Sequence, residues 1–129
     1  MTLHPAQLKN LKDMRELLSD PSRWTKKAYA RDPGGWSLPS THQHATCWCI
    51  LGAQAKTAPS HADRIKLKGG VTFNFAIFEA LKNQIGAKGQ EGIPYWQDAE
   101  ARTHADVLAL LDRTIAYETK KCGKSKSTV

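Results

Sequence analysis

Apolar residues recur three or four positions apart over much of the chain, which is the spacing of one face of an α-helix. Four segments show this pattern: 3–19, 42–57, 72–85 and 103–121. Pro21, Pro59 and Gly86 closely follow the first three segments. Because proline cannot continue a helix and glycine favours its C-terminal cap, we expect these three helices to end there.

The first and last helices are each predicted to turn one apolar face toward a common core. The predicted stripe of the first helix consists of Leu8, Leu11, Arg15 and Leu18, with Met14 and Leu17 beside it. Thr103, followed three residues later by Asp106, resembles a capping box and places the start of the last helix.

The segment 42–57 is apolar on nearly every side, which is typical of a central, buried helix. Trp48 is expected to belong to the core. Gly52 costs a helix about 1 kcal/mol relative to alanine. Its presence therefore indicates that another stretch of backbone packs closely against this position.

Two shorter stretches are less regular. Residues 64–75 alternate around Gly69 and Gly70 like a β-hairpin, but the helical pattern from 72 onward covers more residues. We therefore predict a helix over 72–85, with a short extended segment near 64–68. Residues 23–31 are expected to form one or two helical turns, ended by the sequence Asp-Pro-Gly-Gly at 32–35.

These patterns predict an all-α protein built as an irregular bundle of four to five helices. The chain has 129 residues, of which 40% are hydrophobic and 24% charged, and this suits one hydrophobic core. We predict a single helical domain over 1–122 and a basic, flexible tail over 123–129, whose composition offers little apolar surface to order it.

The cysteine count and the absence of long apolar runs bear on location. Three cysteines, an odd number, argue against a disulfide framework and favour a reducing compartment. No apolar run approaches the roughly 18 residues that a membrane span needs, and the first residues lack the pattern of a secretion signal. We expect a cytoplasmic protein without a membrane partner.

The formal net charge of +7 is concentrated near the C-terminus. Residues 113–129 carry five lysines and arginines against one glutamate, Glu118. Such a segment can keep the protein soluble and complement the helix dipole. It can also make an electrostatic contact with phosphate groups or an acidic protein face.

Aromatic and basic residues alternate in a second stretch, 23–31. Trp24, Trp36 and Trp96 fall at predicted element ends or in loops, where tryptophan either plugs the edge of a core or anchors a partner. The residues that we predict to bind a partner are Arg23, Trp24, Lys26, Lys27, Arg31, Trp36, Lys120, Lys121, Lys124 and Lys126.

Four potential metal ligands, His42, His44, Cys47 and Cys49, lie within eight residues. On a continuous helix, His42 and Cys49 project to one side and the other two to the opposite side, so the four cannot surround one zinc ion. Only a helix that begins after residue 45 would let both histidines fold back. We predict buried hydrophobic cysteines, no metal and no cofactor.

Cys47 and His44 also have the residue types of a nucleophile and its base. Such a pair needs an exposed, electropositive setting, whereas the surroundings of Cys47 are apolar and would raise the pKa of its thiol. The chain has no phosphate-binding loop, dinucleotide fingerprint, serine elbow or zinc-protease motif. The carboxylates at 106, 112 and 118 are expected on a solvated helix face, and Asp98 is expected to pair with Arg102.

Several sequence blocks together resemble a small bacterial and phage family of helical domains of unknown function. The blocks are W-T-K-K-A-Y-A-R-D at 24–32, A-T-C-W-C-I-L-G-A at 45–53, W-Q-D-A at 96–99, and R-T at 102–103 with V-L-A-L-L at 107–111. The chain departs from the pattern at Lys27, where glycine is expected, and at Gln97, where asparagine is usual. Residues 56–92 and the basic tail have no counterpart. The resemblance implies a compact, cytoplasmic helical domain from a mobile element, and it brings no reaction or catalytic residues.

These observations favour a small, basic, non-enzymatic interaction protein that binds an acidic protein or a nucleoprotein, as an accessory or counter-defence factor of a phage or mobile element. The first alternative is direct nucleic-acid binding through the same cations, without sequence specificity because no helix-turn-helix spacing is evident. The second is a small enzyme that uses Cys47 and His44.

Overall fold

The computed structural model describes the chain except for residues 1, 66, 68–69, 87–91 and 128–129, and it describes side chains up to residue 122. In the described part, the α-helices are α1 (Pro5–Leu17), α2 (Ile50–Thr57), α3 (Phe73–Ile85), α4 (Ile93–Asp98) and α5 (His104–Ser127). Two short 3-10 helices, η1 (Pro21–Arg23) and η2 (Ala62–Arg64), and three two-residue strands, β1 (Ala30–Arg31), β2 (Ser37–Leu38) and β3 (Cys47–Trp48), complete it. The mostly helical class is thus confirmed, with a small sheet that was not predicted.

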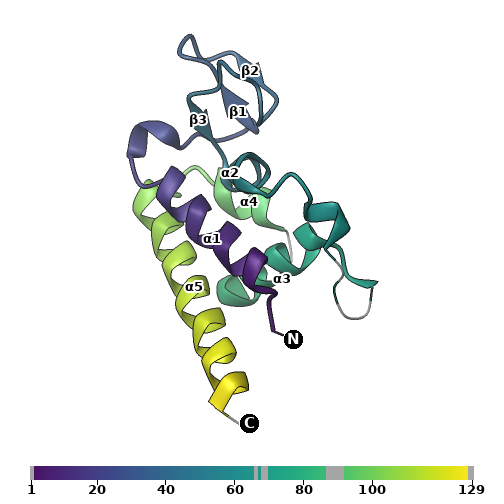
Figure 1. The fold of residues 1–129 in the computed structure, drawn as a ribbon. Coiled ribbons are helices and arrows are strands. Elements are labelled where there is room, and N and C mark those ends of the chain that lie inside the picture. The colour runs from purple at the N-terminus through teal and green to yellow at the C-terminus, as the bar shows by residue number, and fades with distance from the viewer. Residues whose placement is uncertain (1, 66, 68–69, 87–91, 128–129) are drawn as a thin grey trace.

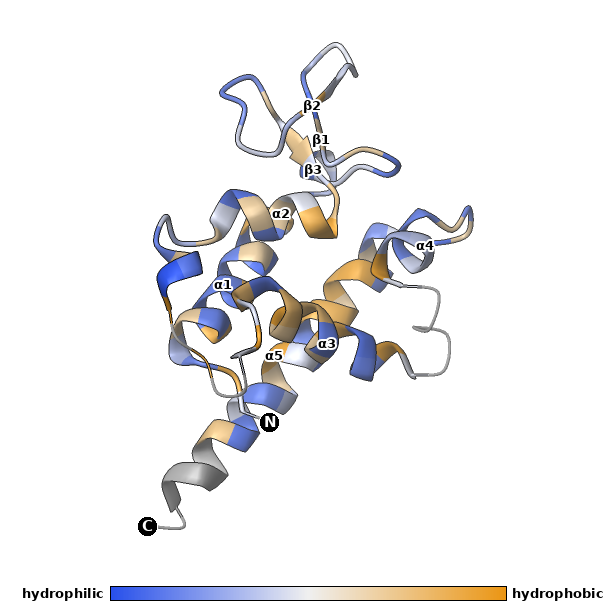
Figure 2. Cartoon of the chain, turned by 90° about the vertical axis from the view of Figure 1, so that its right-hand side faces the viewer, coloured by the Kyte–Doolittle hydropathy of each residue, from blue (hydrophilic) through white to orange (hydrophobic). Residues whose placement is uncertain are grey.

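The core lies where the helices meet, and the strands extend from one end of the bundle (Figure 1). Helix α1 packs on α2 and α5, and α3 packs on α5 and α4. Hydrophobic residues concentrate along these contacts, whereas the loops around the strands are mostly hydrophilic or intermediate (Figure 2). The strand end and the C-terminal end of α5 therefore lie at opposite ends of the molecule.

The buried face of α1 differs from the predicted stripe. Leu11, Met14 and Leu18 are fully buried, but Leu8 and Arg15 are only half-buried. The remaining core positions are taken by two amides, Gln7 and Asn10. Each has a distant partner: Gln7 Nε2 donates to Phe73 O at 2.9 Å, and Asn10 Nδ2 donates to Thr57 Oγ1 at 2.7 Å. A buried amide is tolerated when its hydrogen bonds are made, which periodicity cannot reveal.

Two helix predictions are confirmed by their caps. Thr72 accepts the N–H of Phe75 at the start of α3, and Gly86 ends the helix with φ of 81°. Thr103 and Asp106 form the predicted capping box, with N–H···O distances of 3.0 and 3.2 Å.

Because α3 begins at Phe73, the hairpin alternative was wrong for residues 73–75. Part of the extended segment at 64–68 lies outside the described residues.

Helix α5 continues to Ser127, beyond its predicted end at 121. The side chains from 123 onward lie outside the described part. The separate, flexible tail over 123–129 stays a prediction.

The prediction of one long helix over 42–57 was wrong, because α2 begins only at Ile50. Residues 47–48 instead form β3, which pairs with β1 so that Ala30 faces Trp48, and β1 pairs with β2 on its other side. The expected helical turns at 23–31 are replaced by η1 and β1. A two-residue strand is too short to show an alternating pattern, so its partners alone define it.

The inference from Gly52 is confirmed. An added Cβ there would lie 1.9 Å from Tyr29 O and 2.8 Å from Tyr29 C. The backbone that enters β1 therefore crosses directly over α2, and this crossing positions the strand unit on the bundle.

Candidate functional site

The segment between η1 and β2 gathers most of the residues that we predicted to bind a partner, and it rests on α4. Trp24 is half-buried, and its indole Nε1 donates to Gln97 Oε1 at 2.8 Å. The same oxygen accepts the N–H of Ile50 at 3.0 Å. Gln97 is fully buried and so joins η1, α2 and α4 through one side chain. Trp24 therefore closes the edge of the core.

Lys26 and Arg31 point their charges at backbone carbonyl groups. Lys26 Nζ donates to Ala99 O at 2.6 Å, just after the end of α4. The Arg31 guanidinium donates to Thr25 Oγ1, Lys26 O and Gly35 O, each at 3.0 Å. These bonds hold the loops on both sides of β1 in place, so the two cations have structural partners.

Lys27 differs from its neighbours in its backbone. Its φ is 63°, a left-handed conformation that favours glycine. Its N–H donates to Asp98 Oδ1 at 2.9 Å, which holds the residue in this conformation. The resemblance implies glycine at this position, and the left-handed turn gives a physical reason for that preference. Lys27 itself is exposed.

A pocket of about 360 Å³ opens beside Lys27. Its walls come from the segment just before β1, from β2, from the N-cap and first turn of α2, and from α4. The lining residues are Lys27, Ala28, Tyr29, Ser37, Cys49, Leu51, Pro94, Gln97 and Asp98. Sequence reasoning missed Tyr29, Ser37 and Gln97 as site residues, because only the packing of β2 and α4 around the crossing backbone places them together.

The turn between β1 and β2 presents Trp36 to solvent, with 76% of its surface exposed. The turn is held by Asp32, whose carboxylate accepts the N–H of Trp36 at 2.9 Å and whose own N–H donates to Trp36 O at 3.0 Å. Arg31 fixes it further through Gly35 O. A large aromatic side chain is thus exposed on a rigid support.

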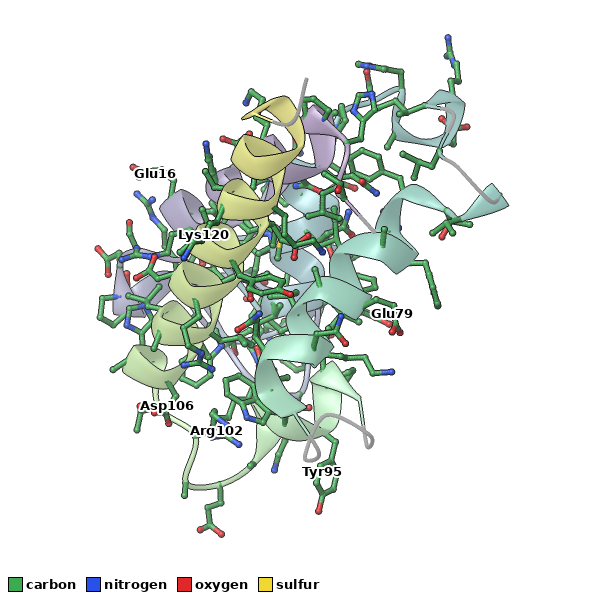
Figure 3. The ribbon with its side chains drawn as sticks, turned by 90° about the horizontal axis from the view of Figure 1, so that it is seen from below. Glu16, Glu79, Tyr95, Arg102, Asp106 and Lys120 are labelled. Atoms are coloured by element: carbon green, nitrogen blue, oxygen red, sulfur yellow. The ribbon has the colours of Figure 1, made fainter. Side chains whose placement is uncertain are left out.

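Two tyrosines near the pocket are also more than half exposed. Tyr29 lines the pocket, and Tyr95 adjoins its lining residue Pro94. Tyr95 points away from the body of the molecule in Figure 3. With Trp36, they are three of the five exposed large hydrophobic residues of the described part.

The C-terminal part of α5 lies far from this end (Figure 1). Lys120 is exposed on the helix surface (Figure 3). Lys121 Nζ lies 3.4 Å from Glu118 Oε2, and Glu118 is only 4% exposed, so its prediction as a solvated residue was wrong. The side chains of Lys124 and Lys126 lie outside the described part. Those of the ten predicted residues whose side chains are described therefore do not form one continuous surface.

Asp98 and Arg102 do not form the predicted pair, because α4 ends at Asp98 and Arg102 lies in the loop before α5. Arg102 instead stacks on Trp96, 3.9 Å from the ring centroid, and donates to Trp96 O at 2.9 Å. It also lies 3.9 Å from Asp106, and Figure 3 shows the two side by side. Asp98 is left to contact Lys27 and Gln97.

The cysteines at 47 and 49 are half-buried rather than buried, which corrects their assignment to the core. Cys49 caps α2, and its sulfur accepts the N–H of Gly52 at 3.3 Å. Burial raises the pKa of the Cys49 thiol, and the charge of Asp98 raises it further, against the smaller opposing effect of the helix N–H groups. Cys47 Sγ lies 3.9 Å from Arg31 O, and within the described part no hydrogen bond links it to His44.

The predicted helical geometry of the four potential ligands was wrong, since residues 42–46 are not helical. His42 and His44 lie ring to ring, with centroids 5.1 Å apart. Among the residues that the structure describes, no group of three or more histidines, cysteines or carboxylates could hold a metal ion.

The fold and this site define a small helical domain that carries a three-stranded unit with a pocket at its base. The chain belongs to a family of unknown function, DUF6197, whose model matches residues 4–117. The match includes the segment 56–92, for which no sequence block was recognised, while the individual blocks and the phage origin stay predictions. No curated protein and no solved structure is significantly similar to the chain. No helix in the described part is long and apolar enough to cross a membrane.

Proposed function

We propose that the protein is a non-enzymatic binding module that engages an acidic protein or nucleoprotein through the turn between β1 and β2. The observation that carries the proposal is Trp36, the most exposed large hydrophobic residue of the described part, on a turn fixed by Asp32 and Arg31. Tryptophan is enriched among residues that dominate binding energy. A rigid support lowers the entropy cost of using it.

The segment 23–36, which includes this turn, carries four lysines and arginines against one aspartate, and this favours an acidic partner. Arg23 and Lys27 are exposed, and Lys26 and Arg31 add positive charge while their side chains bond to the backbone. Complementary charge accelerates association and selects among partners, even where it adds little affinity. The matched family has no known function. A role as an accessory or counter-defence factor of a mobile element therefore rests on the sequence resemblance alone.

Replacement of Trp36 by alanine tests the proposal. We expect Trp36→Ala to weaken binding of the partner at least tenfold, since loss of such an anchor typically costs 2 kcal/mol or more. Stability should change by less than about 0.5 kcal/mol, because the side chain is mostly in solvent. The partner is captured from cells that encode the protein and then titrated in purified form with each variant.

Tyr117→Ala is the matched control, an aromatic residue of α5 that is also about half exposed. It should leave binding unchanged. If the purified partner binds Trp36→Ala as tightly as the unmodified protein, the turn is not the binding surface and the proposal is wrong.

Direct nucleic-acid binding is tested by titrating labelled duplex and single-stranded DNA at several salt concentrations. We expect no specific affinity, because the strand end, which carries Lys27, and the C-terminal end of α5 lie at opposite ends of the molecule. Tight binding that falls steeply with salt and disappears on removal of residues 120–129 would instead establish nucleic acid as the partner.

A further inference from the structure

The pocket beside the turn holds two opposite charges that do not pair with each other. Lys27 and Asp98 both line it. Within the described part, no ion pair shorter than 4.0 Å includes either residue. Opposite charges that line one cavity attract each other, so a structural cause is needed for their separation.

The backbone explains the separation. Asp98 Oδ1 accepts the N–H of Lys27 and also a hydrogen bond from the Gln97 side-chain amide. Gln97 is itself fixed by Trp24 and Ile50, so the carboxylate is held by a buried support. Lys27 contacts this carboxylate through its main chain in the left-handed conformation, and its ammonium group is not used for the contact.

Each charged group therefore retains binding capacity toward the pocket. Oδ2 of Asp98 accepts no hydrogen bond from the described residues, and the ammonium of Lys27 donates none to them. Tyr29 and Ser37 also line the pocket. Apolar surface comes from residues 28, 51 and 94.

We infer that this pocket binds a small zwitterion of the α-amino-acid class, with Asp98 receiving its ammonium group and Lys27 its carboxylate. The volume of about 360 Å³ lies at the lower end of the range for small-molecule sites and suits a ligand of this size. The apolar wall and the Tyr29 ring receive the side chain. Trp36 does not line the pocket, so this inference is independent of the proposed partner-binding function.

Three matched ligands test both charges on the unmodified protein: L-phenylalanine, L-phenylalaninamide, which lacks the carboxylate, and N-acetyl-L-phenylalanine, which lacks the ammonium. Binding is followed by calorimetry and by protection of Cys49 from alkylation in a Cys47→Ser, Cys122→Ser protein, because Cys49 lines the same pocket. We expect the free amino acid to bind at least tenfold more tightly than either derivative and to slow alkylation.

Two substitutions test which residue binds each charged group of the ligand. Asp98→Asn keeps the Oδ1 acceptor but removes the charge, and it should weaken L-phenylalanine at least tenfold while leaving N-acetyl-L-phenylalanine unchanged. Lys27→Gly removes the ammonium and suits the left-handed backbone, and it should weaken L-phenylalanine similarly while leaving the amide unchanged. Asp63→Asn and Lys12→Ala, exposed charges outside this pocket, are the controls.

Two results on the protein with unchanged Lys27 and Asp98 would overturn the inference. One is equal affinity for all three ligands, and the other is that none of them binds or protects Cys49. Loss of L-phenylalanine binding in the two control variants would overturn the assignment to Asp98 and Lys27. Trp36→Ala should bind L-phenylalanine normally, so failure of the proposed function and failure of this inference are distinguishable.

Discussion

Gly52→Ala is expected to destabilise the protein by more than about 3 kcal/mol, the upper end of the usual cost of overpacking. The added methyl group would lie 1.9 Å from Tyr29 O, and the obstacle is backbone that a side-chain rotation cannot move. To admit it, α2 must separate from the strand unit, which also strains the hydrogen bond from Cys49 N to Tyr29 O. Chemical denaturation measures the loss, which is a large fraction of the 5–15 kcal/mol that holds a typical domain together.

Gly34→Ala is the matched control for this prediction. Its added Cβ would lie 3.4 Å from the nearest side-chain atoms, and its φ is not in the left-handed region. Stability should be unchanged or raised by up to about 1 kcal/mol, as for other compatible glycine-to-alanine changes. Equal stability of the two variants would show that the close approach at Gly52 does not exist.

Gln97→Met is expected to lower the free energy of unfolding by about 2–5 kcal/mol. Methionine fills a similar volume but leaves the N–H of Ile50 and the indole N–H of Trp24 without their acceptor. An unsatisfied buried donor typically costs about 1–3 kcal/mol. The N–H of Ile50 is buried and that of Trp24 is partly buried, and both lose their acceptor. Denaturant unfolding gives the size of the effect.

Gln43→Met, at an exposed loop position, controls for the substitution itself and should change stability by less than about 0.5 kcal/mol. If Gln97→Met unfolds at the same denaturant concentration as this control, the buried amide does not hold η1, α2 and α4 together. The support of Asp98 in the pocket would then also need another explanation.

The candidate site was only partly predictable from sequence. Trp36 and Lys27 were selected because exposed aromatics and cations are common in binding surfaces, and the structure places both at the strand end. Trp24, Lys26 and Arg31 are also aromatic or cationic residues, yet each forms a hydrogen bond with a partner inside the fold. Composition alone does not distinguish a side chain that faces solvent from one that closes a core edge, since the partners come from distant segments.

Local sequence patterns predicted α1, α3 and α5, the Gly86 end of α3, the capping box of α5 and the close backbone approach at Gly52, because helix formation depends on residues within one or two turns. Tertiary structure alone decided the strands, the late start of α2 and the burial of Gln7, Asn10 and Glu118. It also decided the juxtaposition of Lys27 with Asp98, which lie 71 positions apart. Strand pairs and buried polar groups are stable only through partners remote in the chain, and no local pattern encodes where those partners will lie.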